Sequence, residues 1–196
     1  MLRIIAPLTL FALAAGPALA ETPMAQPNAD VERIAKARGA IKGLAEGLKA
    51  KLVTAMKDGG PVAALDVCNI EAPKITAARS AESGMSVART ALKVRNQNNA
   101  ADDFERRVME QFIEKIKSGA DAMKLEHAET VEMDGKKVFR YMKPIMTAGS
   151  PCLACHGSEL KPPVAEKIKA LYPKDEATGF SAGDMRGAFT VKQAIE

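Results

Sequence analysis

The stretch Ser150-Pro151-Cys152-Leu153-Ala154-Cys155-His156-Gly157 contains the pattern Cys-x-x-Cys-His, and the rest of the chain is organised around it. This pattern is the attachment sequence of a c-type haem. The two thiols are spaced to reach the two vinyl groups on one porphyrin edge, and the adjacent histidine supplies a nitrogen to the iron. We therefore predict one haem c, bound covalently through Cys152 and Cys155, with His156 as an axial ligand.

Two other kinds of site use a Cys-x-x-Cys pair. Half of a zinc site would need a second ligand pair, and a thioredoxin-type redox pair is expected in a βαβ context. Neither context is visible in the sequence, so haem attachment is the preferred interpretation.

The N-terminus predicts an exported protein. Arg3 precedes an apolar run from Ile4 to Ala15, and the small residues Ala18 and Ala20 lie where signal peptidase reads its substrate. The run is too short for a membrane anchor of roughly 20 apolar residues. We expect a signal peptide over residues 1–20, a disordered leader over 21–28, a single haem-binding domain over 29–196, a periplasmic location, and no stable membrane insertion after processing.

The charge of the mature chain is mild. Removal of residues 1–20 leaves 27 basic and 24 acidic residues, a formal charge of +3. Trp is absent and only two Tyr are present, so stacking platforms for nucleic acid are missing, and no dense Lys/Arg cluster replaces them. Nucleic-acid binding is not expected.

Cys68 is left over once Cys152 and Cys155 carry thioether bonds. An odd thiol in an exported protein is buried and inert, paired between chains, or used chemically. The residues alone leave these three options open.

The N-terminal part predicts long helices. Apolar residues recur every three or four positions over residues 31–56, and Asp58-Gly59-Gly60-Pro61 should end that helix. Gly39, Gly43 and Gly47 share one face, which indicates close approach of another helix or of a second subunit. A homodimer through this helix is one hypothesis. Pro61 should start a second helix towards Ala72, with Pro73 forcing a turn or kink.

The remaining elements predict an α+β fold, with helices first and then an antiparallel sheet. Asp134-Gly135 is a hairpin signal, and Pro162-Pro163 starts a helix. The expected elements are a strand over 86–94, a helix from the cap Asp102 to Gly119, strands over 123–133 and 137–146, a helix over 162–171, and a last strand over 187–191.

Several segments together resemble the single-haem, c-type, PAS-like sensor domain family, a domain family of unknown function. The similarity extends over nearly all of the mature chain and rests on the segments 65–75, 84–90, 93–99, 102–105, 152–157, 172–180 and 183–188. It implies a PAS-like antiparallel sheet with long N-terminal helices. It also implies that His156 and Cys68 are the two axial ligands of the iron. Gln97 and Phe104 depart from the family pattern, at a loop and at a packing position.

Other residues compete for the second axial position. His127 and the methionines Met85, Met142, Met146 and Met185 are the rivals of Cys68, and an open site is the third option. Methionines at these spacings usually pack in the core, and so does Tyr141.

Three arginines, Arg89, Arg95 and Arg186, are candidates for binding the two haem propionates, because guanidinium pairs well with carboxylates. Structural ion pairs with Glu105, Asp102 or Asp184 are the equal alternative.

Two functions follow from these expectations. A thiolate-ligated iron predicts a redox or small-ligand (gas) sensor that acts through a separate signalling protein or a dimer. The alternative is a small periplasmic electron-transfer cytochrome with an unknown redox partner. An enzyme is the weaker interpretation, because no acid and base pair accompanies the motif, although thiolate–haem catalysis stays open.

Overall fold

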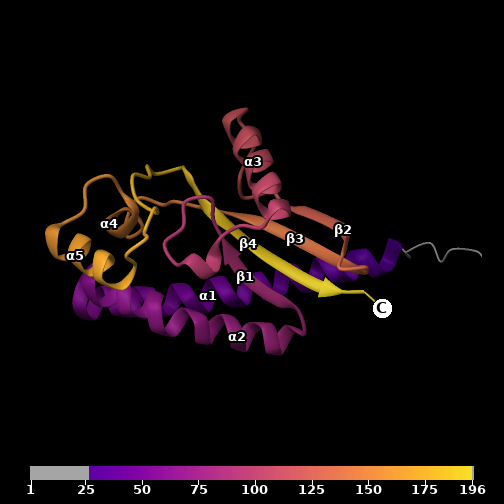
Figure 1. Ribbon diagram of the computed structural model, residues 1–196, viewed down its shortest axis with the longest axis horizontal. Helices are drawn as coiled ribbons and strands as arrows, with labels where there is room; N and C mark the ends of the chain where they lie inside the picture. The colour runs from indigo at the N-terminus through magenta and orange to yellow at the C-terminus, as the bar shows by residue number, and fades with distance from the viewer. Residues whose placement is uncertain (1–26, 196) are drawn as a thin grey trace, which may run out of the picture.

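The computed structural model describes residues 27–195 of the chain (Figure 1). The expected signal peptide and most of the expected leader lie outside these residues. The sheet is antiparallel, with the strand order β1-β4-β3-β2. Its strands are β1 (Ser86–Thr90), β2 (His127–Met133), β3 (Lys136–Met146) and β4 (Met185–Ala194). The predicted α+β class is confirmed.

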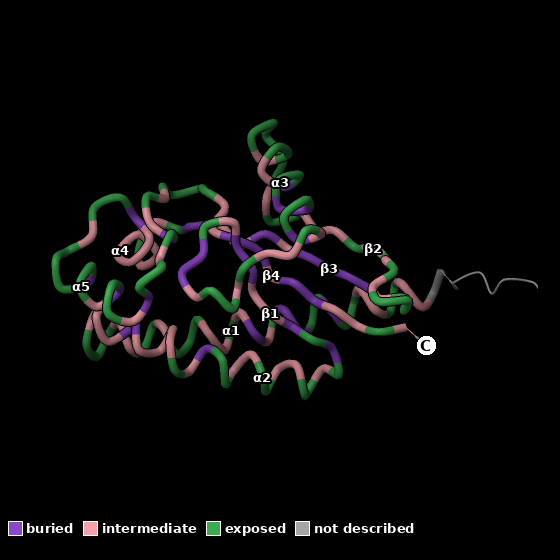
Figure 2. The backbone as a smooth tube through the Cα atoms, viewed as in Figure 1, coloured by how far each residue is buried: buried purple, intermediate pink, exposed green. Residues whose placement is uncertain are grey.

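Helices pack on both faces of the sheet. On one face, α1 (Pro27–Asp66) buries Ala37, Ile41 and Leu44 against a cluster from β1, β3 and β4 that includes Phe139 and Tyr141. On the other face, α3 (Asp103–Lys117) buries a second set, Val108, Met109 and Phe112, against Met142 and Ala188. Figure 2 shows the buried residues concentrated along β3 and β4, between these helices. Tyr141 lies in the core, as expected.

The long N-terminal helix is broken where the sequence predicts. Gly60 has φ 67° and ψ −162°, a conformation that glycine adopts readily and that interrupts the helix before Pro61. The turn expected at Pro73 does not form, because the chain stays helical through it. A π-helical turn, η1 (Val67–Glu71), leads directly into α2 (Ala72–Ser83), and the Ala72 amide donates to the Val67 carbonyl. Pro73 lacks an amide hydrogen, and the wider turn removes the need for one there.

The glycine strip of α1 is explained within the chain at two of its three positions. A Cβ on Gly47 would lie 3.2 Å from Ile75 Cγ2 of α2, and one on Gly43 would lie 3.5 Å from Arg79 Cδ. A Cβ on Gly39 would meet nothing within 4 Å. Gly43 and Gly47 thus allow α2 to approach α1 closely. The homodimer stays a prediction.

Several element boundaries differ from the expectation. The first strand ends at Thr90, after which the Ala91 amide donates to the Asn99 carbonyl and the Val94 carbonyl accepts from the Glu176 amide in a distant loop. The strand expected from residue 123 begins at His127, because Asp121 holds a turn by accepting from the Met123 amide. The last strand is longer than expected, since β4 pairs with both β1 and β3. The hairpin at Asp134-Gly135 forms as predicted, with positive φ at both residues.

A buried charge network attaches α3 to the sheet. The helix starts with a capping box between Asp102 and Glu105. Arg140 of β3 is almost fully buried and donates to both carboxylates, at 2.9 Å and 3.1 Å. The Thr190 hydroxyl donates to Glu105 at 2.8 Å. Asp102 and Glu105 therefore pair with Arg140 and not with Arg89, Arg95 or Arg186.

No helix within residues 27–195 combines the length and the apolar character that crossing a bilayer requires.

Candidate functional site

The motif cysteines lie at one end of the sheet. Residues 153–156 form a single helical turn, α4 (Leu153–His156), which lies with α5 (Pro162–Leu171) beside the C-terminal end of α1 (Figure 1). Cys155 packs against a buried cluster that contains Leu65 of α1 and Ile168 of α5. The helix that carries Cys68 and the helix that carries the motif therefore share one core.

The loop between α5 and β4 fixes the backbone of the motif. The Phe180 amide donates to the His156 carbonyl at 2.9 Å, and the Gly179 amide donates to the Gly157 carbonyl at 3.0 Å. The Phe180 ring stands edge-on to the imidazole, with 6.3 Å between ring centroids. Residues 175–180 thus form one wall of the site.

Two groups contact Nδ1 of the His156 imidazole. Its Nδ1 lies 2.8 Å from the Ala177 carbonyl oxygen and 3.2 Å from Arg186 Nε. Arg186 can only donate and the carbonyl can only accept. A protonated Nδ1 therefore pairs with the carbonyl, and an unprotonated Nδ1 pairs with Arg186. We assign the proton to Nδ1, because the carbonyl contact is shorter, and this assignment leaves the lone pair of Nε2 available to a metal.

Burial and two cations keep this imidazole neutral. Desolvation, followed by the charges of Arg186 and Arg95, lowers the pKa of His156 to about 3. Neutral imidazole is the form that binds a metal. The protein therefore presents His156 as a ligand rather than as a cation.

Arg95 connects three segments of the site. Its side chain is only 7% exposed and forms a two-pronged ion pair with Asp175, at 3.0 Å and 3.1 Å. Its Nη2 also donates to the Cys155 carbonyl at 2.7 Å and to the Ala177 carbonyl at 3.2 Å. Nε and Nη2 of the guanidinium thus bond to the protein itself, while Nη1 has no hydrogen-bond partner among residues 27–195.

Arg89 and Arg186 form no ion pair within the part of the chain that the structure describes. Burial lowers the pKa of both guanidinium groups, that of Arg186 to about 10. The Arg186 side chain donates to the Lys93 carbonyl at 3.1 Å, and the Arg89 side chain forms no hydrogen bond among these residues. Two desolvated guanidinium groups without carboxylates are the partners that two carboxylates would need, so this donor set fits a haem.

Cys68 lies on the π-helical turn, next to these arginines. Burial raises the pKa of its thiol, while the charges of Arg89, Arg95 and Arg186 lower it. The charge of Cys68 in turn contributes to raising the pKa of Cys155, so the two thiols are close enough to interact. Of the candidates for a second axial ligand, Cys68 is the one that the fold brings to the motif in this way.

Its rivals pack elsewhere. His127 contacts Glu129 at 3.0 Å and stacks edge-on against Phe104. Met142 is fully buried against α3, and Met185 packs against the same cluster. Met85 belongs to the core under α1, and Met146 pairs with Met185 across β3 and β4.

Three residues of the site were not singled out from the sequence. Asp175 pairs with Arg95, the Ala177 carbonyl accepts from His156, and buried Tyr172 lies near enough to Cys68 for the thiol charge to help raise its pKa to about 12. All three lie in the segment 172–180, whose similarity to the family was the available signal.

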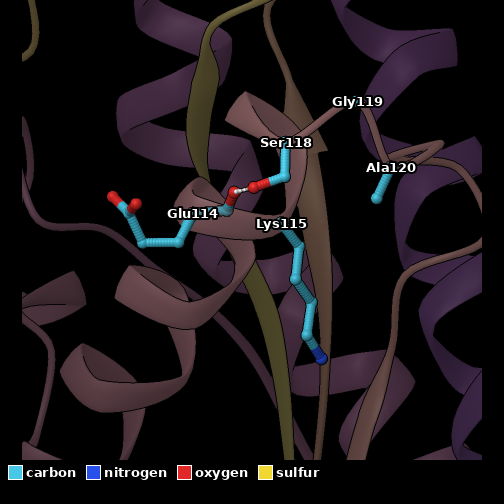
Figure 3. A pocket seen from close by; sticks show the side chains of 5 residues that line it. All are labelled: Glu114, Lys115, Ser118, Gly119 and Ala120. Carbon is cyan, nitrogen blue, oxygen red and sulfur yellow. Dashed lines mark hydrogen bonds between the residues drawn. The ribbon is translucent and has the colours of Figure 1, made fainter.

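A groove of about 530 Å³ adjoins the site, between Asn69 and Pro73 on one side and residues 171–174 on the other. A second hollow, of about 450 Å³, lies at the C-terminal end of α3 (Figure 3). There the Ser118 hydroxyl donates to the Glu114 carbonyl at 2.8 Å. This hollow is far from the motif and holds no candidate residue.

The zinc alternative gains no support from residues 27–195, which contain no group of three or more His, Cys, Asp or Glu side chains placed to hold a metal ion.

Comparison with known proteins agrees with this arrangement. No curated protein matches the sequence. The crystal structure of the cyanobacterial haem protein Tll0287 matches with a TM-score of 0.65 at 25% sequence identity, covering 88% of this chain and 98% of that chain. The family model named Tll0287-like matches residues 20–194. Because that match covers almost the whole chain, the protein belongs to the Tll0287-like family.

Proposed function

We propose that this chain is an exported haem protein that carries one haem c on Cys152 and Cys155. The observation that supports this most strongly is the orientation of His156, whose Nδ1 lies 2.8 Å from the Ala177 carbonyl oxygen, so that Nε2 is left to coordinate when Nδ1 carries the proton. The two arginines without ion pairs, Arg89 and Arg186, would hold the propionates. A c-type haem supplies an iron that changes oxidation state and takes two axial ligands.

We propose Cys68 as the second axial ligand. Leu65, three residues before it, shares a buried cluster with Cys155 of the motif. Burial raises the pKa of the Cys68 thiol, and three guanidinium groups near it partly offset this rise. Electron donation from a thiolate stabilises the ferric state, so a low reduction potential is expected. Enzymatic turnover is the weaker proposal, because six-coordinate iron has no vacancy for a substrate.

The placement of Cys68 favours a sensor over a plain electron carrier. The cysteine lies on a π-helical turn between α1 and α2, and such turns are frequent at functional sites. Release of the sulfur on reduction, or on binding of a gas, would free that turn to change, and α2 packs directly on α1. A shift of α2 would be read by a separate signalling protein or by a second copy of the chain.

The first test is the optical and electron spin resonance spectrum of the exported holoprotein, with three variants. Cys152→Ala should lose one thioether bond, which mass spectrometry of the denatured protein detects. Cys68→Ala should lose the low-spin thiolate signature of the ferric state. The control is Met85→Leu, which changes a buried rival far from the motif and should leave the spectrum unchanged. A wild type without covalent haem would contradict the proposal.

Carbon monoxide binding separates the sensor from the carrier. A sensor that releases Cys68 on reduction should bind carbon monoxide in the ferrous wild type about as well as in Cys68→Ala. A sensor in which the gas itself displaces Cys68 should bind it more weakly than the variant but still reach saturation. A carrier keeps both ligands in both iron states, so only the variant should bind carbon monoxide. Failure of the ferrous wild type to bind it at saturating gas would make the electron carrier the better proposal.

A further inference from the structure

The Ala177 carbonyl oxygen serves two donors at once. It accepts from His156 Nδ1 at 2.8 Å and from Arg95 Nη2 at 3.2 Å. The strength of a histidine's Nδ1–H bond sets the basicity of its other nitrogen, and therefore how much electron density it gives to a metal. A second, cationic donor on the same oxygen weakens the hydrogen bond that this oxygen accepts from the imidazole.

The geometry holds Arg95 firmly in this place. Asp175 fixes the guanidinium through two bonds, and the Asp175 carboxylate also accepts from the Ala177 amide at 3.0 Å. The same Nη2 reaches the Cys155 carbonyl, one residue before the histidine. One side chain thus ties the motif helix to the loop that carries the acceptor.

We propose that Arg95 is a positioning residue for His156, which acts through the Ala177 carbonyl to limit the electron donation of the imidazole. This inference rests on the proposed haem function and assigns Arg95 to the proximal side of the iron instead of to a propionate. With Arg95 in place, the imidazole donates less electron density to the iron, and the ferrous state is therefore more stable than it would be if the Ala177 carbonyl accepted from His156 alone. This effect partly offsets the stabilisation of the ferric state by the thiolate.

The test is the reduction potential of the holoprotein with Arg95→Lys. Lysine keeps the charge, but it cannot hold Asp175 and two carbonyls together as the planar fork does. We expect the ferric-to-ferrous ratio at a fixed potential to rise roughly tenfold, which for one electron is about 59 mV. The His156 Nδ1–H resonance of the diamagnetic ferrous state should also shift to lower field, as its hydrogen bond strengthens.

The matched control is Arg140→Lys. Arg140 is also a buried arginine paired with carboxylates, but it lies under α3, away from the motif. The Arg140→Lys variant should be less stable than the wild type but should have the same reduction potential. If Arg95→Lys leaves the potential unchanged or raises it, or if Arg140→Lys shifts it equally, the proposal is overturned.

A second variant covers failure of Arg95→Lys to mature. The double change Arg95→Gln/Asp175→Asn removes the ion pair without leaving an unpaired buried charge, a replacement that proteins often tolerate. Net charge is unchanged, so the same fall in potential would be due to the lost hydrogen bonds and would support the proposal. An unchanged potential would overturn it. A wild type that carries no haem would instead refute the function on which the inference rests.

Discussion

Glu105→Ala should destabilise the protein strongly, because Glu105 completes the buried network under α3. Its side chain is 5% exposed, and its partner Arg140 is 1% exposed. The substitution leaves Arg140 with Asp102 alone, which is a half-exposed carboxylate. It also removes the acceptor of the Thr190 hydroxyl and one half of the capping box.

The magnitude follows from these three losses. Breaking a buried ion pair costs about 3 kcal/mol at the lower end of the usual range, which applies because Asp102 remains. The lost Thr190 bond and the lost cap contribute about 1 kcal/mol or slightly less each. The free energy of unfolding should fall by about 4 to 5 kcal/mol, which lowers the midpoint of thermal unfolding by roughly 10–15 °C for a domain of this size.

Denaturant unfolding followed by circular dichroism measures this change, and the haem spectrum checks that the motif end stays intact. Glu105→Gln is the matched variant. It keeps the cap and the hydroxyl contact and loses only the charge, so it should cost clearly less. Glu129→Ala removes an exposed partner of Arg107 and should cost at most about 1 kcal/mol. The reasoning fails if Glu105→Ala costs no more than Glu129→Ala.

Two further predictions concern α1. Gly39→Ala should stabilise the protein by about 0.5–1 kcal/mol, since Gly39 lies on an open helix face. Gly47→Ala should stabilise it less, or destabilise it, because Ile75 must move. Equal gains in denaturant unfolding would contradict this expectation. Hydrogen bonding from Arg38 holds the pKa of Glu126 below its ordinary value, so its contribution is present above the ordinary glutamate pKa and is lost as pH falls through the folded-state pKa. Glu126→Gln should therefore flatten the acid limb of the stability–pH curve, and an unchanged limb would contradict this.

The parts of the fold that the sequence predicts are those with local signals. Asp134-Gly135 specifies a tight hairpin, Asp102 caps the helix that follows it, and Gly60-Pro61 breaks the first helix. Each signal acts within four residues of its own position, so a pattern in one sequence is enough. The α+β class follows from the order of these elements.

The site also contains residues that a local pattern predicts and residues that only the fold brings together. The motif names three residues within five positions, and counting the cysteines isolates Cys68. The partner of Arg95 is different, because Asp175 lies 80 residues further along the chain, and only the folded loop brings them together. The expectation that Asp102, Glu105 or Asp184 would pair with the site arginines failed because a strand residue, Arg140, reaches two of these carboxylates first.

The π-helical turn at 67–71 also sets the angular phase of Cys68 with respect to the chain around it. A π-helical turn holds one residue more than an α-helical turn, and each residue of an α-helix turns the side-chain direction by about 100°. Deleting one residue from this turn would restore regular winding. With α2 held in place, it would rotate the sulfur by about 100° relative to α2, together with the buried Leu65 three residues before it. The direction of a single atom is thus encoded as a count of residues and is coupled to the packing of the core beside it.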